Sequence, residues 1–227
     1  MSAVLAPPAS PRLSTDEAQA VLQQWIAEGD AREAVMNRAG PGVASPQQWA
    51  GKSGLEQMQA MLDGLLPFAP IARTLDFSLI RVAPGKALFQ GTPGPQHFNP
   101  MGGVHGGWFA TLLDSALGCA VHTLMPAGRG YTTAELSVNY VRGLSPKVGR
   151  VRAEGTVLHC GKQLATAEAR LFGPDGTLFA HATTTCLVFD LPDLGVVALG
   201  HAPHQLAQLE VGAALGLLRG RGLAFGL

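Results

Sequence analysis

The chain has 227 residues, of which 47% are hydrophobic and 14% are charged. This composition excludes disorder along the whole chain, because disorder needs low hydrophobicity and a high net charge. Sixteen basic residues balance sixteen acidic ones, so the chain lacks the overall positive charge that draws a protein to nucleic acid, and we expect no nucleic-acid partner.

The cysteines and the N-terminus indicate where such a chain works. Three cysteines stand far apart, at Cys119, Cys160 and Cys186. This spacing suits neither a disulfide framework nor a zinc site, so we expect free thiols and no metal. The first residues lack the pattern of a secretory signal, and the most apolar stretch, 104–125, carries Asp114. We therefore expect a cytoplasmic protein without a membrane partner.

Residues 1–70 are predicted to be a helical extension that packs on a larger body. Ser14 with Glu17, and Ser53 with Glu56, have the spacing of capping boxes that open two helices, the second running to about residue 66. One apolar face of the first helix is predicted at Ala18, Val21, Leu22, Trp25 and Ile26.

Residues 71–190 are predicted to be the main domain, in which strands dominate. Alternating apolar residues indicate strands at 75–79, 86–91, 130–142, 149–159, 162–172 and 177–189, with one long helix at 104–125. Short connections between strands imply antiparallel pairing. One helix wrapped by one antiparallel sheet is an α+β architecture. Residues 191–227 are expected to be a weakly ordered tail or one short helix.

The long helix carries one candidate catalytic group. Nearly all of its side chains are apolar or small, which is typical of a buried helix, and Asp114 is its only formally charged residue. A lone carboxylate in an apolar wall is typical of a tuned acid or base. The alternative is a structural one, in which Asp114 caps or hydrogen-bonds a nearby backbone group.

A glycine-rich loop, 101–107, comes directly before this helix. Backbone N–H groups at a helix start are free, and the helix dipole makes that end positive. The N–H of Gly106 or Gly107 is therefore a candidate oxyanion donor; an ordinary loop is the alternative. His105 and Asp114 are nine residues apart, on opposite faces and about 13 Å apart along a helix. If both serve one site, either a second subunit supplies Asp114 or His105 bends away in the loop, and a two-fold dimer would solve this.

Three segments resemble one known family. They are Phe98-Asn-Pro-Met-Gly-Gly-Val-His-Gly-Gly107 with Thr111-Leu-Leu-Asp-Ser-Ala116, Tyr131-Thr-Thr-Ala-Glu-Leu-Ser-Val-Asn-Tyr140, and Gly161-Lys-Gln-Leu-Ala165. They resemble the hotdog-fold acyl-CoA thioesterases of the phenylacetate-degradation (PaaI) type. The resemblance covers about residues 71–189 and implies the hotdog fold: a curved antiparallel sheet wrapped around one long helix.

The resemblance also implies roles for residues. Asp114 would act as base or nucleophile, Gly106 as oxyanion donor, Asn99 as a holder of the attacking water, and Thr133 as a hydroxyl beside the carboxylate, with Thr132 as its alternate. His105 would orient the loop or assist the leaving thiolate. It implies sites shared between the subunits of a homodimer or homotetramer, and no metal or redox cofactor.

For the CoA moiety, the resemblance points to the surface of the later strands. Basic residues gather there, at Arg129, Arg142, Lys147, Arg150, Arg152 and Lys162. Some of these are candidates for a phosphate contact; solvated strand-end charges are the alternative. The substrate-binding set that we predict is Gly107, Thr132, Arg142, Lys162 and Gln163.

The sequence thus predicts a thioesterase acting on a small or aryl acyl-CoA. Two alternatives stay open: a hotdog hydroxyacyl-thioester dehydratase, and a non-catalytic acyl-CoA-binding protein. The presence of Asp114, nine residues after the His105-Gly-Gly motif, favours hydrolysis over both.

Overall fold

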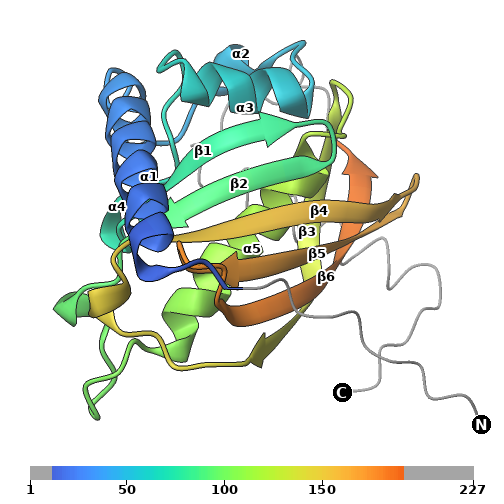
Figure 1. The fold of residues 1–227 in the computed structure, drawn as a ribbon. Helices are drawn as coiled ribbons and strands as arrows, with labels where there is room; N and C mark the ends of the chain where they lie inside the picture. Colours follow the sequence, from blue (N-terminus) through green and yellow to red (C-terminus); the bar gives the residue numbers. More distant parts are fainter. Residues whose placement is uncertain (1–11, 192–227) are drawn as a thin grey trace, which may run out of the picture.

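The computed structural model describes residues 12–191 (Figure 1). The tail expected over 191–227 therefore lies, after its first residue, outside the described residues. No helix in the described range combines the length and the apolar character needed to cross a membrane.

The N-terminal part of this range is helical, as predicted. It holds α1 (Thr15–Met36), α2 (Pro46–Trp49), α3 (Gly54–Leu62) and α4 (Pro70–Thr74). Both predicted capping boxes are present, at Ser14 and at Ser53. Helix α3 ends four residues before the expected position, because Gly64 adopts a φ of 68° and the N–H of Leu65 bonds back to the carbonyl of Ala60 at 2.9 Å.

Six strands form one antiparallel sheet. They are β1 (Phe77–Ala83), β2 (Lys86–Gly91), β3 (Arg129–Tyr140), β4 (Val151–Cys160), β5 (Leu164–Phe172) and β6 (Leu178–Asp190), in the order β1-β2-β4-β5-β6-β3. Strand β1 begins two residues later than predicted. Leu75 caps α4, and Asp76 adopts a left-handed φ of 50° that turns the chain into the strand.

Helix α5 (Gly106–His122) lies along one face of this sheet (Figure 1). It is shorter than the predicted 104–125, since Val104 pairs with Phe98 in an isolated bridge and Thr123 caps the helix. Its packing is close enough that a Cβ on Gly155 would lie 2.2 Å from the carbonyl oxygen of Ala116. The curved sheet around a buried helix, with helices preceding it, confirms the predicted α+β hotdog fold.

Beyond its first two residues, only one face of α5 is not fully buried. Its half-buried residues follow one another at helical spacing and are Ala110, Thr111, Asp114, Ser115, Cys119 and His122. The remaining faces are covered by the sheet, where Leu112, Leu113, Leu117 and Val121 are fully buried. The expectation of burial on all faces was therefore wrong for this one stripe.

Helix α1 is held on the sheet by a polar cluster around an ion pair. Glu28 accepts from Arg152 at 2.6 Å and from Arg81 at 2.7 Å, while the Arg152 guanidinium lies 4.6 Å from the centre of the Trp25 ring. Burial alone would raise the pKa of Glu28, but its bonds to the two guanidiniums outweigh burial and lower it. The predicted apolar face of α1 is confirmed, with Trp25 as its buried centre.

We expect Glu28→Gln to lower the free energy of unfolding by about 2 kcal/mol, because it leaves the buried Arg152 without its counter-charge. Urea denaturation at pH 7 measures this change. Asp16→Asn, an exposed change on the same helix, should cost less than about 1 kcal/mol. Since the pKa of Glu28 is lowered on folding, its contribution is lost as the pH falls; a Glu28→Gln deficit that persists undiminished in acid would contradict the assignment.

Candidate active site

Asp114 stands in the middle of the open face of α5, facing β3. Its carboxylate Oδ1 accepts a hydrogen bond from the Thr133 hydroxyl at 3.2 Å. Burial raises the pKa of Asp114, and the bond from Thr133 partly offsets that rise. Thr132, one residue earlier on the strand, alternates to the other face, so the structure brings Thr133 to the carboxylate and not Thr132.

The titratable groups around Asp114 are neutral at ordinary pH. Burial raises the pKa of the Cys119 thiol to about 12 and that of the Tyr131 phenol well above its usual value, and the charge of Asp114 adds to both rises. Burial also raises the pKa of Cys186. The Asp114 carboxylate is therefore a negative charge among apolar and neutral groups, a setting that favours proton uptake.

A cavity of about 270 Å³ begins at this carboxylate. Its floor is formed by α5, through Asp114, Ser115, Gly118 and Cys119, and by β3, through Tyr131 and Thr133. From there it runs under the first two strands toward the N-terminal helices. A largely apolar cavity with a few convergent polar groups, here the Asp114 carboxylate and the Thr133 hydroxyl, is the usual form of a small-molecule site.

The N-terminus of α5 presents one free backbone donor. His105 is the N-cap, and its Nδ1 accepts from the N–H of Gly107 at 2.9 Å. Within residues 12–191 the N–H of Gly106 has no acceptor, and the helix dipole makes this end positive. Of the two predicted oxyanion donors, Gly106 is thus the available one, and the accepting Nδ1 leaves the proton of a neutral His105 on Nε2.

Tyr140 packs against this donor and was not singled out from the sequence. Its hydroxyl donates to the carbonyl of Gly106 at 3.0 Å, and a Cβ on Gly106 would lie 3.2 Å from the phenol. Only glycine therefore fits at position 106 without displacing the ring. Nothing in the local pattern marks this contact, which joins the end of β3 to the start of α5.

Asn99 organises the glycine-rich loop. Its side-chain oxygen accepts from the N–H groups of Met101 at 3.0 Å and Gly103 at 3.2 Å, and its own N–H donates to the carbonyl of Gly103. The side-chain NH₂ makes no hydrogen bond within residues 12–191. The loop therefore positions an amide donor, beside which a ligand or water can bind.

Within one chain the carboxylate and the free N–H stay apart. Gly106 and Asp114 are eight residues apart on one helix, which is about 12 Å along its axis. On β3, Thr133 lies beside the carboxylate and Tyr140 beside the glycine, about 23 Å apart on an extended strand. A single subunit does not bring these groups to one substrate atom.

The predicted basic cluster separates into paired and unpaired residues. Arg150 pairs with Asp30, Arg152 with Glu28, and Arg129 with Asp190. Arg150 and Arg152 thus attach α1 to the sheet and are not candidates for a phosphate contact. Arg142, Lys147 and Lys162 form no ion pair within residues 12–191.

Two of the exposed predicted residues lie together, and a third lies far from them. Lys162 and Gln163 are in the turn before β5, where the Lys162 carbonyl accepts from Arg129 at the start of β3. Arg142 follows the other end of β3. The structure therefore does not bring Arg142 to the other two residues within one chain.

Comparisons with known proteins agree on the kind of domain. Residues 101–180 match the family model of the thioesterase superfamily. A Halobacterium salinarum protein named as a candidate esterase is 36% identical over 84 residues, which are 36% of this chain and 54% of that protein. This chain therefore spans about half the length of that relative.

Two solved structures are also similar. A phenylacetic acid degradation-related protein from Ralstonia eutropha JMP134 is 26% identical, with a TM-score of 0.53 over 57% of this chain and 97% of that one. A thioesterase family protein from Silicibacter pomeroyi is 26% identical, with a TM-score of 0.50 over 53% of this chain and 90% of that one. Both likenesses extend over nearly the whole of the solved chain.

We expect Thr133→Val to raise the pKa of Asp114, because it removes the hydrogen bond that stabilises the ionised carboxylate. An NMR titration of the aspartate side-chain carboxyl carbon measures this shift. Thr132→Val is the matched control and should leave the titration in place. An unchanged titration in Thr133→Val would show that the hydroxyl does not act on the charged form.

Proposed function

From a hotdog domain that belongs to the thioesterase superfamily and is PaaI-like, we propose that this protein hydrolyses an acyl-CoA thioester to the free acid and CoA. One observation carries the proposal: the half-buried Asp114 carboxylate, held by Thr133, stands at the end of an apolar cavity. An acyl group suits such a cavity, and a thioester carbonyl at its mouth would meet the carboxylate.

In the proposed reaction Asp114 takes a proton from water as the water oxygen attacks the carbonyl carbon. The Gly106 N–H receives the negative charge that develops on the carbonyl oxygen. The C–S bond then breaks, the Nε2–H of His105 donates a hydrogen bond to the departing thiolate, and the proton held by Asp114 passes to the products through solvent. The Asn99 amide would hold the water. Direct attack by the carboxylate is the alternative, and it uses the same residues.

We further propose that two chains complete each site. The β1 edge of the sheet is covered by α1, α3 and α4, whereas the outer edge of β3 pairs with no strand of residues 12–191. A long uncovered edge strand is a template for pairing with a second chain. This favours a dimer built by antiparallel β3 pairing.

The register of that pairing would bring the two halves of the site together. About a two-fold axis between Leu136 and Ser137, Thr133 of one chain stands opposite Tyr140 of the partner subunit. Asp114 would then face the partner subunit's Gly106 N–H. The same axis would place Arg142 near the partner subunit's Lys162 and Gln163, where they suit the phosphates of CoA.

We expect Asp114→Asn to lower kcat by about 10²–10⁴, the usual worth of a positioned acid or base. The assay is thiol release over a panel of short, long and aryl acyl-CoAs. Turnover near that of the unmodified protein would remove Asp114 from the mechanism. A protein that binds a non-hydrolysable analogue but hydrolyses none of the panel would be an acyl-CoA-binding protein instead.

A thermal melt of Asp114→Asn distinguishes a loss of catalysis from a loss of folding. Because the folded state raises the pKa of Asp114, its ionisation opposes folding, and the stability of the native chain falls as the pH rises through the folded pKa. The melting temperature of Asp114→Asn should therefore be higher than that of the native chain at pH 8 and equal to it at pH 3. A lower melting temperature at both pH values would indicate a structural role.

A second prediction tests the shared site. Gly106→Pro removes the proposed donor and, through its Cβ, also shifts the Tyr140 ring by a few tenths of an ångström. Proline is tolerated at the first position of a helix, and His105 is extended at ψ 137°. Each single variant should be inactive. Refolding Asp114→Asn with an equal amount of Gly106→Pro should restore about a quarter of the native activity, because half the dimers carry one intact site. No recovery from folded, mixed dimers would refute the two-chain site.

A further inference from the structure

The far half of the cavity that begins at Asp114 is built by the N-terminal helices. Its walls there are apolar and come from α1, α3, α4 and the segment leading into α4, through Met36, Met58, Met61, Phe68, Ile71 and Ala72. None of these side chains lies within the stretch 101–180 that matches the thioesterase superfamily. The extension is thus part of the cavity as well as a cover for the sheet edge.

The chemistry of this wall selects an apolar occupant. Three of its side chains are methionines, which are flexible and adapt to irregular apolar groups. The strand wall adds Phe77, Leu79 and Phe89. Asp114, at the opposite end, is the one formally charged residue that lines the cavity within the described chain. An uncharged, hydrocarbon-like group fits this space.

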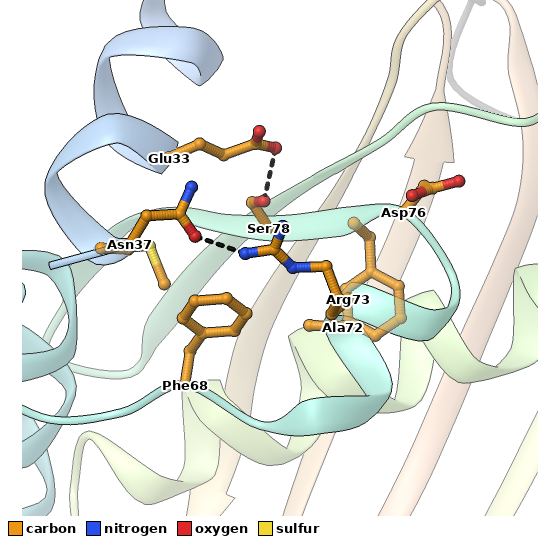
Figure 2. Close-up of a pocket in the computed structure, with 9 residues that line it drawn as sticks. Glu33, Asn37, Phe68, Ala72, Arg73, Asp76 and Ser78 are labelled. Carbon is orange, nitrogen blue, oxygen red and sulfur yellow. Dashed lines mark hydrogen bonds between the residues drawn. The ribbon is translucent and has the colours of Figure 1, made fainter. Parts of the chain in front are cut away.

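Polar side chains close the outer end of the cavity. A small pocket of about 80 Å³ lies there (Figure 2). It shares Met36, Phe68, Ala72, Phe77 and Ser78 with the cavity. Glu33 accepts from Ser78 at 2.7 Å, and Arg73 bonds to Asn37 while lying 5.6 Å over the Phe68 ring. A hydrocarbon that reached past Met36 would have to enter this polar layer, which is unfavourable.

The volume of the cavity sets the size of its occupant. A cavity of about 150 Å³ lined by apolar side chains holds benzene, with its six carbons. By proportion, a cavity of about 270 Å³ holds about ten non-hydrogen atoms. That is the size of a medium-length saturated acyl chain or of a single-ring aryl-acyl group.

We propose that the N-terminal helices are the specificity-determining part of the site: Met36 and Ala72 close an acyl cavity that accepts medium-length or single-ring acyl groups and excludes long chains. This inference rests on the proposed thioesterase function. It adds the acyl class and assigns that selectivity to residues outside the part of the chain that matches the superfamily.

The test changes the length of the cavity in both directions. Met36→Ala lengthens the outer end by the space of about three non-hydrogen atoms, and Ala72→Leu fills about the same space. The probes are saturated acyl-CoAs from acetyl to palmitoyl and phenylacetyl-CoA. In the native chain, kcat/KM should rise to a maximum near eight to ten carbons and fall beyond, since each methylene in an apolar pocket is worth about tenfold or more.

Each variant should move that maximum in its own direction. Met36→Ala should shift it by about two carbons toward longer chains, and Ala72→Leu should reduce kcat/KM for the medium chains at least tenfold while butyryl-CoA changes little. Met125→Ala and Ala60→Leu are matched controls, because both sites are buried and neither lines the cavity. The controls should leave the length profile unchanged.

The outcomes separate this inference from the function on which it rests. If the native chain hydrolyses acyl-CoAs but all four variants keep the native length profile, the helices do not set specificity and the inference is overturned while the thioesterase remains. If nothing is hydrolysed, the proposed function fails. Calorimetry with S-alkyl-CoA thioethers of the same lengths then measures which chain lengths bind, and so tests whether the helices set the length preference. A binding preference that shifts toward longer chains in Met36→Ala supports the inference. The same preference in Met36→Ala and in the native chain overturns it.

Discussion

The structure depends on the burial of α5 against one curved sheet. The helix presents Leu112, Leu113, Leu117 and Val121 to the strands without leaving any of their surface exposed, and the absence of a side chain at Gly155 lets the helix backbone contact β4. Apolar burial of this kind is the main driving force of folding. It also decides where chemistry is possible, because only the stripe that carries Asp114 stays open.

The carboxylate on that stripe opposes the stability of the fold that positions it. An ionised Asp114 half-buried among apolar groups is unfavourable, which is why its pKa is raised. The single bond from Thr133 relieves part of this penalty and orients the carboxylate. Such a cost in stability is expected at a functional site, because a carboxylate that is partly removed from water takes up a proton more readily than a fully solvated one.

The N-terminal helices and β3 divide the surface of the sheet between them. The helices cover the β1 edge and close one end of the cavity, and α1 is attached by the ion pair of half-buried Glu28 with buried Arg152. The β3 edge is left uncovered within residues 12–191. In the proposed dimer that edge would join two chains, so that one edge of the sheet serves substrate selection and the other serves assembly of the site.

The sequence by itself determined the local features. Capping boxes placed the starts of α1 and α3, alternation placed five of the strands within two residues, and the lone Asp114 with its preceding glycine-rich loop marked the candidate site. These features follow from neighbours in the chain, whose backbone and side-chain periodicities are set by residues a few positions away. The α+β class was predictable for that reason, whereas the hotdog fold was implied by the resemblance of three segments to a known family.

Only the tertiary structure decided which of several equivalent candidates has the geometry that the proposed reaction needs. It chose Gly106 over Gly107, because His105 engages the second N–H, and Thr133 over Thr132, because alternation turns only one toward α5. It assigned Arg152 to an ion pair 124 residues away in the chain and brought Met36 into the wall of a cavity that begins at Asp114. Such contacts join residues far apart in sequence, and no local period encodes them, since they arise only when the helices and the sheet pack together.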